Sequence, residues 1–484
     1  MTILLLEAIA SSPHLETSGE IALSLNKNKN VSYSWIGHDL PWNDWETPKI
    51  LRILNIKLEN RIPNFLQILK KENIKIITYK ALIHENNYYY NFKKKILKQK
   101  FNLNNIKDIK YKNINIGWGV LSSLISYYKS NDINFKKSNI VKIILSSALI
   151  VERSLNVIEK VKPTKIITFN NRFFFSYPII QISKKLRIPI FRHERGSDYN
   201  KYEIYEKDVH DYRYIRNQIN KYWKNSNLSE EIKIKIAKKY FYDRRNKKKI
   251  GRDIDVSFLS KQKKGAVNIN HLDPKKRKFV YYTSSNYEYT SFTNDFGQQK
   301  AVKNLIKIIK RLKNIELIIR VHPSNNNFAL KEDKNWLKFK DKNIHVLTSS
   351  DKTDSYELMN IADIVITYSS NIILEAAFFG KTSVSMADNM MYSDCKRIIT
   401  ATDRDKLQKI LSPGYKHKSK NYLSCLPVAF YFSTFGKKFK YYKPLNFFEG
   451  KLKGYKLEWK PLLLRVFEQL GIKKIFNLLK FKFR

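Results

Sequence analysis

The sequence has very little cysteine: Cys395 and Cys425 are the only two in 484 residues. They lie far apart in the chain and neither has a histidine cluster beside it, which excludes a disulfide framework and a zinc site of the usual spacing. Such sparse thiols are typical of a protein from a reducing compartment. We therefore expect a cytoplasmic protein.

Long apolar runs are also lacking. No stretch of uncharged apolar residues reaches the length of about 20 that a membrane-spanning helix needs. The first residues, "MTILLLEAIASS", contain a short apolar core interrupted by Glu7 and no basic segment before it. This pattern indicates a first β-strand rather than a signal peptide. We expect a soluble protein that is at most peripheral on the inner face of the cell membrane.

Acidic residues are scarce beside basic ones, with 43 Asp and Glu against 91 Lys and Arg and a formal net charge of +48. An excess of this size is compatible with nucleic-acid binding. The lysines, however, are spread along the whole chain among Asn and Ile, as AT-rich codon usage would produce, and no RNA-recognition signature is present. We predict no nucleic-acid partner and favour anionic lipid or anionic sugar.

The length predicts two domains, because a single core rarely grows this large. The first half alternates short apolar runs with longer helix-compatible stretches, which predicts an α/β domain with a parallel sheet covered on both faces. The expected strands are 3–8, 31–36, 74–79, 165–169 and 188–192.

The same alternation restarts after a polar stretch at residues 243–277. We therefore predict an N-terminal domain over 1–250, a second α/β domain over 278–415, and a basic, aromatic, helical tail over 416–484. In the second domain, the strand expected at 278–285 ends in small polar residues, the segment 315–327 is expected to be a strand that runs into a polar loop, and the apolar run 364–367 is followed by polar residues.

Three strand ends of the second domain share this polar character. The residues concerned are Ser284 and Ser285, then Arg320, His322 and Pro323, then Ser369, Ser370 and Asn371. Because parallel strands end at one edge of the sheet, hydroxyls, an imidazole and a helix N-terminus would meet there and suit a phosphate. Glu375, one turn into the following helix, could accept from ribose hydroxyls. The alternative is ordinary capping and turn chemistry, with Glu375 a solvated carboxylate.

"RVHP" followed by "ADIVITYSSNIILEAAFFGK" resembles the nucleotide-binding half of GT-B glycosyltransferases. It is most similar to capsule polysaccharide biosynthesis proteins with Kdo-transferase-like and sialyltransferase-like HP and SS motifs. The resemblance covers residues 278–390 and implies two Rossmann-like domains facing a cleft, with C-terminal helices packing back on the first domain. It also implies that His322, Pro323, Ser369 and Ser370 hold the phosphate of a CMP-sugar, and that Glu375 lies at the ribose.

The first domain offers candidates for the acceptor side. A strand ends in "HERG", where Glu194 is the first choice for a general base and Arg195 for stabilising a leaving phosphate or an acidic acceptor. The loop after the first strand lacks a glycine-rich phosphate motif and supplies His14 and Glu16 as reserve bases. The alternatives are an ion-paired structural acid for Glu194, and helix-start preferences for His14 and Glu16.

A His-x-Glu-x-Gly stretch also ends the corresponding strand of UDP-N-acetylglucosamine 2-epimerases. The Arg- and Glu-rich motif of that family is absent here, since its position holds "TSSNYEYTS". No Asp-x-Asp pair stands in a strand-end loop, because "GRDIDVS" falls in the polar stretch between the domains. We predict metal-independent chemistry with no cofactor.

The C-terminal sequence "PLLLRVFEQLGIKKIFNLLKFKFR" has apolar residues on one helical face and lysines elsewhere. Such a helix suits an anionic membrane surface, or it packs across the first domain. We predict a GT-B glycosyltransferase that transfers sugar from a nucleotide-activated donor, with CMP favoured, to a surface or capsular polysaccharide or a lipid-linked glycan. The alternatives are an enzyme of the 2-epimerase type and a non-enzymatic scaffold for polyanions or membranes.

Overall fold

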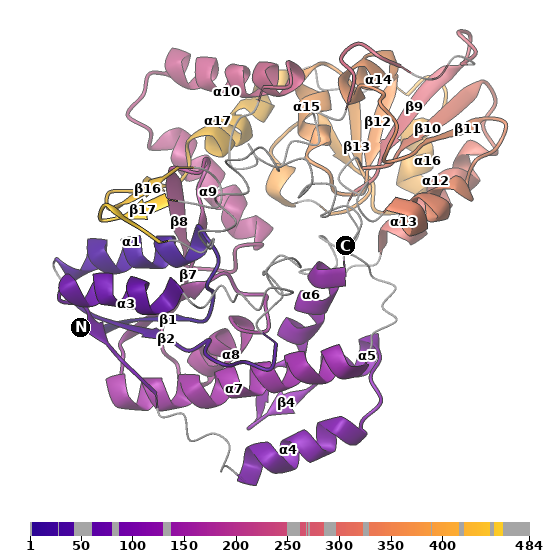
Figure 1. Cartoon of the computed structure of the whole chain (residues 1–484). Coiled ribbons are helices and arrows are strands. Elements are labelled where there is room, and N and C mark those ends of the chain that lie inside the picture. Colours follow the sequence, from indigo (N-terminus) through magenta and orange to yellow (C-terminus); the bar gives the residue numbers. More distant parts are fainter. Residues whose placement is uncertain are drawn as a thin grey trace, which may run out of the picture. The chain divides into compact units, whose positions relative to one another are not determined.

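The computed structural model describes residues 2–27, 29–42, 61–79, 87–128, 137–248, 262–267, 269, 272–284, 297–322, 329–388, 390–415, 421–445 and 450–457. These residues divide into two compact units. The first contains the described residues up to Val209 and those from Gly436 onward, and the second contains those from His210 to Phe435. Figure 1 labels their helices and strands.

The first unit is built on a seven-stranded sheet with the order β15-β8-β7-β6-β1-β2-β3. Its strands are β1 (Thr2–Glu7), β2 (Asn30–Trp35), β3 (Lys75–Ile76), β6 (Lys165–Phe169), β7 (Ile190–Arg195), β8 (Lys201–Tyr205) and β15 (Lys437–Lys438). The strands β7, β6, β1, β2 and β3 run parallel to one another. The strands β8 and β15 are added at one edge in antiparallel pairing. The chain moves outward from β1 in one direction and from β6 in the other, so the order reverses between these two strands.

Helices cover both faces of this sheet. Ile3 and Leu5 pack with α1 and α3 on one face, and Leu4 and Leu6, which alternate with them, are buried as well. Burial on both faces explains why β1 is an almost continuous apolar run. The remaining elements are α1 (His14–Asn26), α3 (Ile62–Lys71), α4 (Asn87–Lys98), α5 (Leu103–Ile106), β4 (Lys110–Tyr111), β5 (Ile114–Asn115), α6 (Gly117–Tyr128), α7 (Lys137–Val161) and α8 (Tyr177–Lys185).

The C-terminal segment returns to the first unit as strands. β15 pairs with β8, and a small sheet follows, made of β16 (Tyr442–Pro444), β17 (Gly450–Leu452) and β18 (Tyr455–Lys456). Glu20 on α1 accepts the backbone N–H groups of Lys440, Tyr441 and Tyr442 at 2.9, 2.6 and 2.8 Å. Gly19 lets the segment approach, because a Cβ there would lie 2.8 Å from Leu452. The expected C-terminal helix lies outside the described residues.

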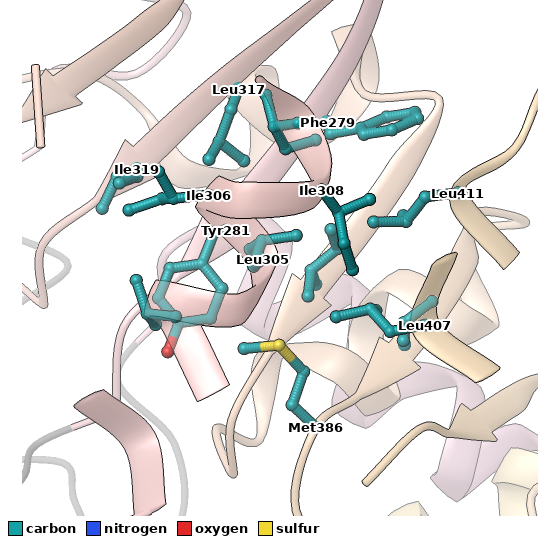
Figure 2. Packing of buried hydrophobic residues seen from close by; sticks show 14 of the residues in the cluster. Phe279, Tyr281, Leu305, Ile306, Ile308, Leu317, Ile319, Met386, Leu407 and Leu411 are labelled. Atoms are coloured by element: carbon teal, nitrogen blue, oxygen red, sulfur yellow. The ribbon is translucent and has the colours of Figure 1, made fainter. Parts of the chain in front are cut away.

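The second unit is built on a six-stranded parallel sheet with the order β11-β10-β9-β12-β13-β14. Its chain order reverses between β9 and β12. The strands are β9 (Arg277–Tyr282), β10 (Ile315–Arg320), β11 (Ile344–Leu347), β12 (Ile364–Thr367), β13 (Thr382–Ser385) and β14 (Ile398–Thr400). The associated helices are α12 (Gly297–Ile309), α13 (Ala329–Leu337), α14 (Ser355–Ile361), α15 (Ile372–Phe378) and α16 (Arg404–Leu411). Figure 2 shows α12 packed on β9 and β10 through Leu305, Ile308 and their neighbours.

Helices α9 (Tyr212–Lys224), α10 (Glu230–Arg245) and α17 (Leu426–Thr434) belong to the second unit. This differs from the predicted boundaries, which assigned residues up to 250 to the first domain and those from 416 to a separate tail. The reason is tertiary: Phe241 of α10 stacks on Phe378 of α15 at a ring distance of 4.0 Å, and both join the apolar cluster that contains Phe430 of α17. The sequence of α10 does not show which partner covers it.

Two Rossmann-like units in one chain make this a two-domain α/β fold of the GT-B-like kind, as the sequence predicts. Each sheet has one point where the strand order reverses, and ligands of open α/β sheets bind at the carboxyl ends of the strands at such a point. Across the described helices, none combines the length and apolar character needed to span a bilayer.

Candidate functional site

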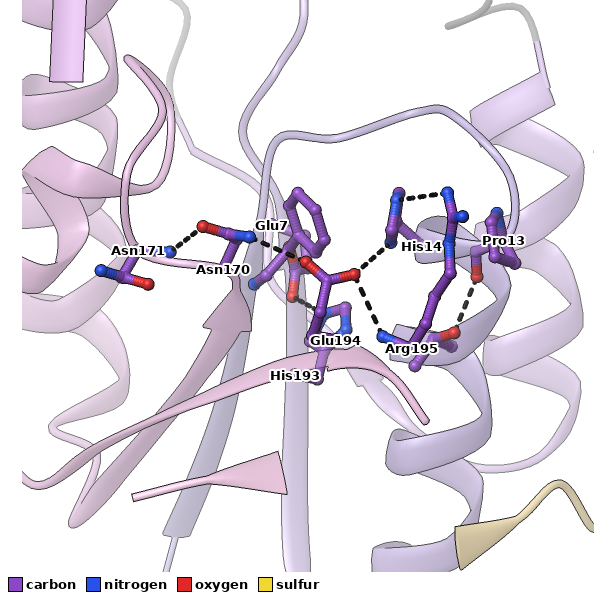
Figure 3. Close-up of polar contacts among 10 residues, drawn as sticks. Glu7, Pro13, His14, Asn170, Asn171, His193, Glu194 and Arg195 are labelled. Atoms are coloured by element: carbon purple, nitrogen blue, oxygen red, sulfur yellow. Dashed lines mark hydrogen bonds and ion pairs between the residues drawn. The ribbon is translucent and has the colours of Figure 1, made fainter. Parts of the chain in front are cut away.

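The carboxyl ends of β1, β6 and β7 form a polar cluster in the first unit, at the point where strand order reverses (Figure 3). Glu7 ends β1, and its Oε1 lies 2.8 Å from Nε2 of His193, while its Oε2 accepts the backbone N–H of Phe169 at 3.2 Å. Both side chains are fully buried. Burial raises the pKa of Glu7 despite the opposing effect of His193. This pair joins the three strands beneath the more exposed residues of the cluster.

Glu194 lies above this pair and is held from two sides. Its Oε2 accepts from Nδ2 of Asn170 at 2.7 Å, and its Oε1 accepts the backbone N–H of Arg195 at 3.0 Å. Burial raises the pKa of Glu194. The charges of His14 and Arg195 and these two hydrogen bonds lower it, and together they outweigh burial, so that the pKa is about 2. Glu194 is therefore ionised at neutral pH and acts as a hydrogen-bond acceptor.

His14 opens α1 and faces Glu194, with Nδ1 3.8 Å from its Oε1. The other ring nitrogen, Nε2, lies 3.5 Å from a guanidinium nitrogen of Arg195. Burial lowers the pKa of His14 to about 3, more than the charge of Glu194 raises it. His14 is thus neutral at neutral pH, so in that range the ionised state of Glu194 depends on Arg195 and the two hydrogen bonds. The structure brings together three of the four predicted acceptor-side residues: Glu194, Arg195 and His14.

Glu16, the fourth, has a different role. Its carboxylate is fully buried, forms an ion pair with Arg61 and accepts from the hydroxyl of Ser12 at 2.6 Å. Arg61 also donates to Ser12 at 2.6 Å. The prediction of Glu16 as a reserve base is therefore corrected: its charge is compensated inside the unit, where it fixes the loop between β1 and α1.

Sequence reasoning missed Asn170 and Glu7, and included His193 only as a neighbour of Glu194 in "HERG". Asn170 follows β6 at a positive φ of 52°, a conformation that asparagine tolerates better than most residues. Its Oδ1 accepts the backbone N–H groups of Asn171 and Arg172 at 2.7 and 3.2 Å, which leaves its amide directed at Glu194. Two features of the sequence could have indicated these residues. They are the asparagine pair that follows the apolar run 165–169 and the glutamate that ends the first strand.

In the second unit, hydrogen bonds join three strand ends around the reversal between β9 and β12. Ser284, after β9, accepts the backbone N–H of Ser369, after β12, at 2.9 Å. Thr283 accepts the backbone N–H of His322, after β10, at 2.9 Å. The predicted residues Ser284, Ser369 and His322 therefore lie along one edge of the sheet, as parallel strands require. Ser285 and Pro323 lie outside the described residues.

Gln298 of α12 fixes the position of Ser284. Its Oε1 accepts the backbone N–H of Ser284 at 2.8 Å, and its Nε2 donates to the carbonyl of Ser284 at 3.1 Å. The hydroxyl of Tyr281 donates to the same Oε1 at 2.9 Å. Gln298 is buried, and no motif in the sequence marks it.

Capping does not account for the polar residues before α15. Asn371 is the N-cap residue but makes no side-chain capping bond, and instead its Oδ1 accepts from the hydroxyl of Tyr392. The backbone N–H of Ser370 donates to the hydroxyl of Thr367 at 3.1 Å. Ser369 and Ser370 are half-buried. The edge therefore holds hydroxyls that helix capping does not use.

Two predicted binding residues have structural roles here. Arg320 is 1% exposed, and its guanidinium donates to the carbonyls of Thr348 at 2.5 Å and Asp351 at 2.9 Å. Glu375 is 2% exposed, and its carboxylate pairs with Arg244 at 2.8 Å and accepts from the hydroxyl of Tyr356. Neither charge is presented to a ligand, because each is satisfied inside the unit. The predictions of Arg320 at a phosphate and Glu375 at a ribose are corrected accordingly.

Within the described ranges, no group of three or more His, Cys, Asp and Glu residues has an arrangement that could hold a metal ion. Metal-independent chemistry remains a prediction.

Comparison with known proteins identifies the family model "UDP-N-acetylglucosamine 2-epimerase" over residues 291–413, inside the second unit. Among solved structures, a KpsC beta Kdo 2,4 transferase of Thermosulfurimonas dismutans is similar at 12% identity, covering 55% of this chain and 78% of the other, with a TM-score of 0.35. A UDP-GlcNAc 2-epimerase of Methanocaldococcus jannaschii, in complex with UDP-GlcNAc and UDP, is 12% identical over 88% of this chain and 98% of its own, with a TM-score of 0.30. MurG of Acinetobacter baumannii is 11% identical over 89% and 93% of the two chains, with a TM-score of 0.24. No curated protein matches the sequence.

Proposed function

We propose that the chain is a glycosyltransferase whose second unit holds the phosphate of a nucleotide-activated sugar. The observation that carries the proposal is the hydrogen-bonded edge at the β9–β12 reversal, where Ser284, Ser369 and His322 come from three successive strand ends. Hydroxyl and imidazole donors suit a diphosphate or phosphodiester oxygen. The family model for a nucleotide-sugar epimerase falls in this unit, which supports the same class of ligand.

The nucleotide is proposed from the resemblance of His322-Pro323 and Ser369-Ser370 to the HP and SS motifs, which favours CMP. A thermal-shift panel of CMP, UDP, GDP and CDP at one concentration tests this, because the nucleotide that binds the folded state most tightly raises Tm the most. We expect selective stabilisation by CMP and its loss in His322→Ala. If that substitution changes neither nucleotide binding nor turnover, the assignment of this edge is wrong.

In the first unit, Glu194 is the proposed acceptor of the proton. The acceptor hydroxyl attacks the anomeric carbon, the bond to the nucleotide phosphate breaks with its electron pair, and the hydroxyl proton passes to Glu194. A carboxylate whose pKa is about 2 is a weak base. Such a base is strong enough for a reaction with an oxocarbenium-like transition state. In that case the hydroxyl loses its proton late, after the new bond to carbon has made its oxygen strongly acidic. His14, neutral beside it, then orients the hydroxyl.

This assignment has a pH signature. Because a pKa of about 2 keeps Glu194 ionised throughout the neutral range, kcat/KM should show no acid limb near pH 6, where an ordinary histidine base would titrate. We expect Glu194→Gln to remove transfer to acceptor while leaving nucleotide binding intact. Near wild-type turnover by this variant would exclude Glu194 as the proton acceptor.

A second candidate is an enzyme of the UDP-N-acetylglucosamine 2-epimerase type, and the family model over residues 291–413 favours it. An epimerase forms product from the nucleotide sugar alone, whereas a transferase releases nucleotide only as sugar reaches an acceptor. NMR of UDP-GlcNAc and of CMP-sugars incubated with the protein, with and without glycan, separates the two. We expect turnover only with acceptor. A 2-epimer formed in its absence would establish the epimerase.

The acceptor is proposed to be a surface or capsular polysaccharide or a lipid-linked glycan, with the protein cytoplasmic and peripheral on the inner face of the membrane. A scaffold that only binds polyanions would release them with salt and would not respond to His322→Ala.

A further inference from the structure

Helix α4 exposes apolar side chains on a strongly basic surface. Tyr88, Tyr90 and Leu97 are 51%, 52% and 48% exposed, so three large apolar residues on a helix of 12 residues face solvent. The stretch 87–100 contains five lysines and no acidic residue. The lysines are Lys93, Lys94, Lys95, Lys98 and Lys100, all exposed.

The helix is anchored on the unit through side chains other than Tyr90 and Leu97. Tyr89 and Ile96 are buried, and Phe92 lies 4.8 Å from the ring of Tyr111. At 3.6 residues per turn, Tyr90 and Leu97 share one flank of the helix, roughly 110–130° around the axis from this anchor, with Lys93 and Lys94 on either side of them. Lys94 Nζ lies 4.4 Å from the ring centre of Tyr90.

We propose that this face of α4, defined by Tyr90, Leu97, Lys93, Lys94 and Lys98, docks on an anionic lipid bilayer. Tyrosine prefers the headgroup region, where its ring is covered and its hydroxyl stays hydrated. Lysines beside it reach lipid phosphates while their aliphatic stems cover apolar surface. A leucine and a tyrosine spaced seven residues apart lie in one line along the helix, as contact with a flat surface requires.

The lysines and the exposed apolar side chains together favour an anionic lipid bilayer over other partners. A nucleic acid or an acidic glycan would use the lysines, but neither covers an exposed leucine on a convex helix. A second copy of this chain, at a net charge of +48, would bring like charges together. Helix α4 contributes no residue to either strand-end cluster, so lipid docking does not depend on the proposed catalysis.

The test measures binding of the full chain to vesicles of phosphatidylglycerol mixed with phosphatidylcholine, and to vesicles of phosphatidylcholine alone. Each lysine near an anionic surface contributes about a fivefold change in partition, so Lys93→Gln/Lys94→Gln should weaken binding about 30-fold. The matched control is Lys184→Gln/Lys185→Gln on α8, which removes the same charge from exposed positions of the same unit. The control should change binding by no more than a few fold.

Insertion is read with a polarity-sensitive dye on Leu97→Cys, with Leu186→Cys, 45% exposed on the chain just after α8, as the control. The two native cysteines are buried, so the introduced thiol reacts preferentially. We expect a blue shift with the anionic vesicles at residue 97 and none at 186. Equal losses for the two lysine pairs, no shift at residue 97, or a shift produced equally by duplex DNA or by self-association would each overturn the proposal.

Discussion

The substitution Glu375→Gln tests whether this carboxylate stabilises the second unit or binds a ligand. The structure places this carboxylate in a buried pair with Arg244 at 2.8 Å, with the two side chains 3% and 19% exposed. Glutamine keeps the shape and a bond to the hydroxyl of Tyr356 but leaves the guanidinium without its counter-charge. Breaking one side of a buried pair costs about 3 kcal/mol. In a unit of this size, that corresponds to a fall in Tm of about 6–12 °C.

Differential scanning calorimetry measures the fall, and titration with CMP at low temperature measures binding by the folded variant. We expect a lower Tm and unchanged affinity, because the carboxylate does not reach a ligand. The control is Glu357→Gln on α14, which loses only a bond from the exposed Asn360 at 2.9 Å. An unchanged Tm together with a large loss of nucleotide affinity would refute this reasoning and restore the ribose role that the sequence predicts.

Three further outcomes follow from other contacts. Glu20→Ala removes the acceptor of three backbone N–H groups, so the segment around residues 440–442 should become susceptible to limited proteolysis, while Tm falls by a few degrees. Gln298→Ala leaves the backbone N–H and carbonyl of Ser284 without partners, which should cost about 1–3 kcal/mol in urea unfolding and weaken nucleotide binding. Because the pKa of Glu194 is lower in the folded protein than in the unfolded chain, its ionisation stabilises the fold. This contribution to the free energy of unfolding is fully present above pH 4.5, the pKa of the unfolded chain, and is lost as the pH falls toward about 2. The gap in unfolding free energy between wild type and Glu194→Gln should therefore narrow in acid, and a gap independent of pH would show that the carboxylate is not stabilised as an anion.

Strands could be predicted from the sequence wherever both faces of a sheet are covered. The run 165–169 coincides with β6 (Lys165–Phe169), since apolar β-branched residues in a short run have few alternatives to a central strand. The end of β7 was harder. Prediction placed it at 192, but it continues to Arg195, because pairing with β8 and the partners of Glu194 compensate the charged residues. The spacing of apolar residues in the sequence does not show that β8 pairs with this strand or that Glu194 has hydrogen-bond partners.

The same limit explains why some site predictions are corrected. Strand-end position places Glu194, His322 and Ser369 at the edges of their sheets, because parallel topology alone brings such ends together, and their roles stay predictions. Arg320 ends β10 and met the same criterion, and Glu16 was predicted from the segment after the first strand, yet their charges are compensated by two backbone carbonyls and by Arg61, respectively. A sequence shows which residues are charged but not which of them form ion pairs or hydrogen bonds inside the protein. Those partners depend on which side chains are buried together, and burial depends on the whole fold.

The two strand-end edges differ in charge, and this difference bears on which one receives the phosphate. The edge of the first unit includes two carboxylates, Glu7 and Glu194, the second of them ionised at neutral pH. In the described part of the second edge, the groups joined by hydrogen bonds are hydroxyls, backbone amides and Gln298, and Glu375 is neutralised by Arg244. A phosphate anion is repelled by an unshielded carboxylate and attracted by amide and hydroxyl dipoles. The serines before α15 therefore suit a phosphate because the carboxylate of Glu375, one turn into that helix, is internally paired. Arg244→Met, which frees the charge of Glu375, should weaken nucleotide binding more than Glu375→Gln does.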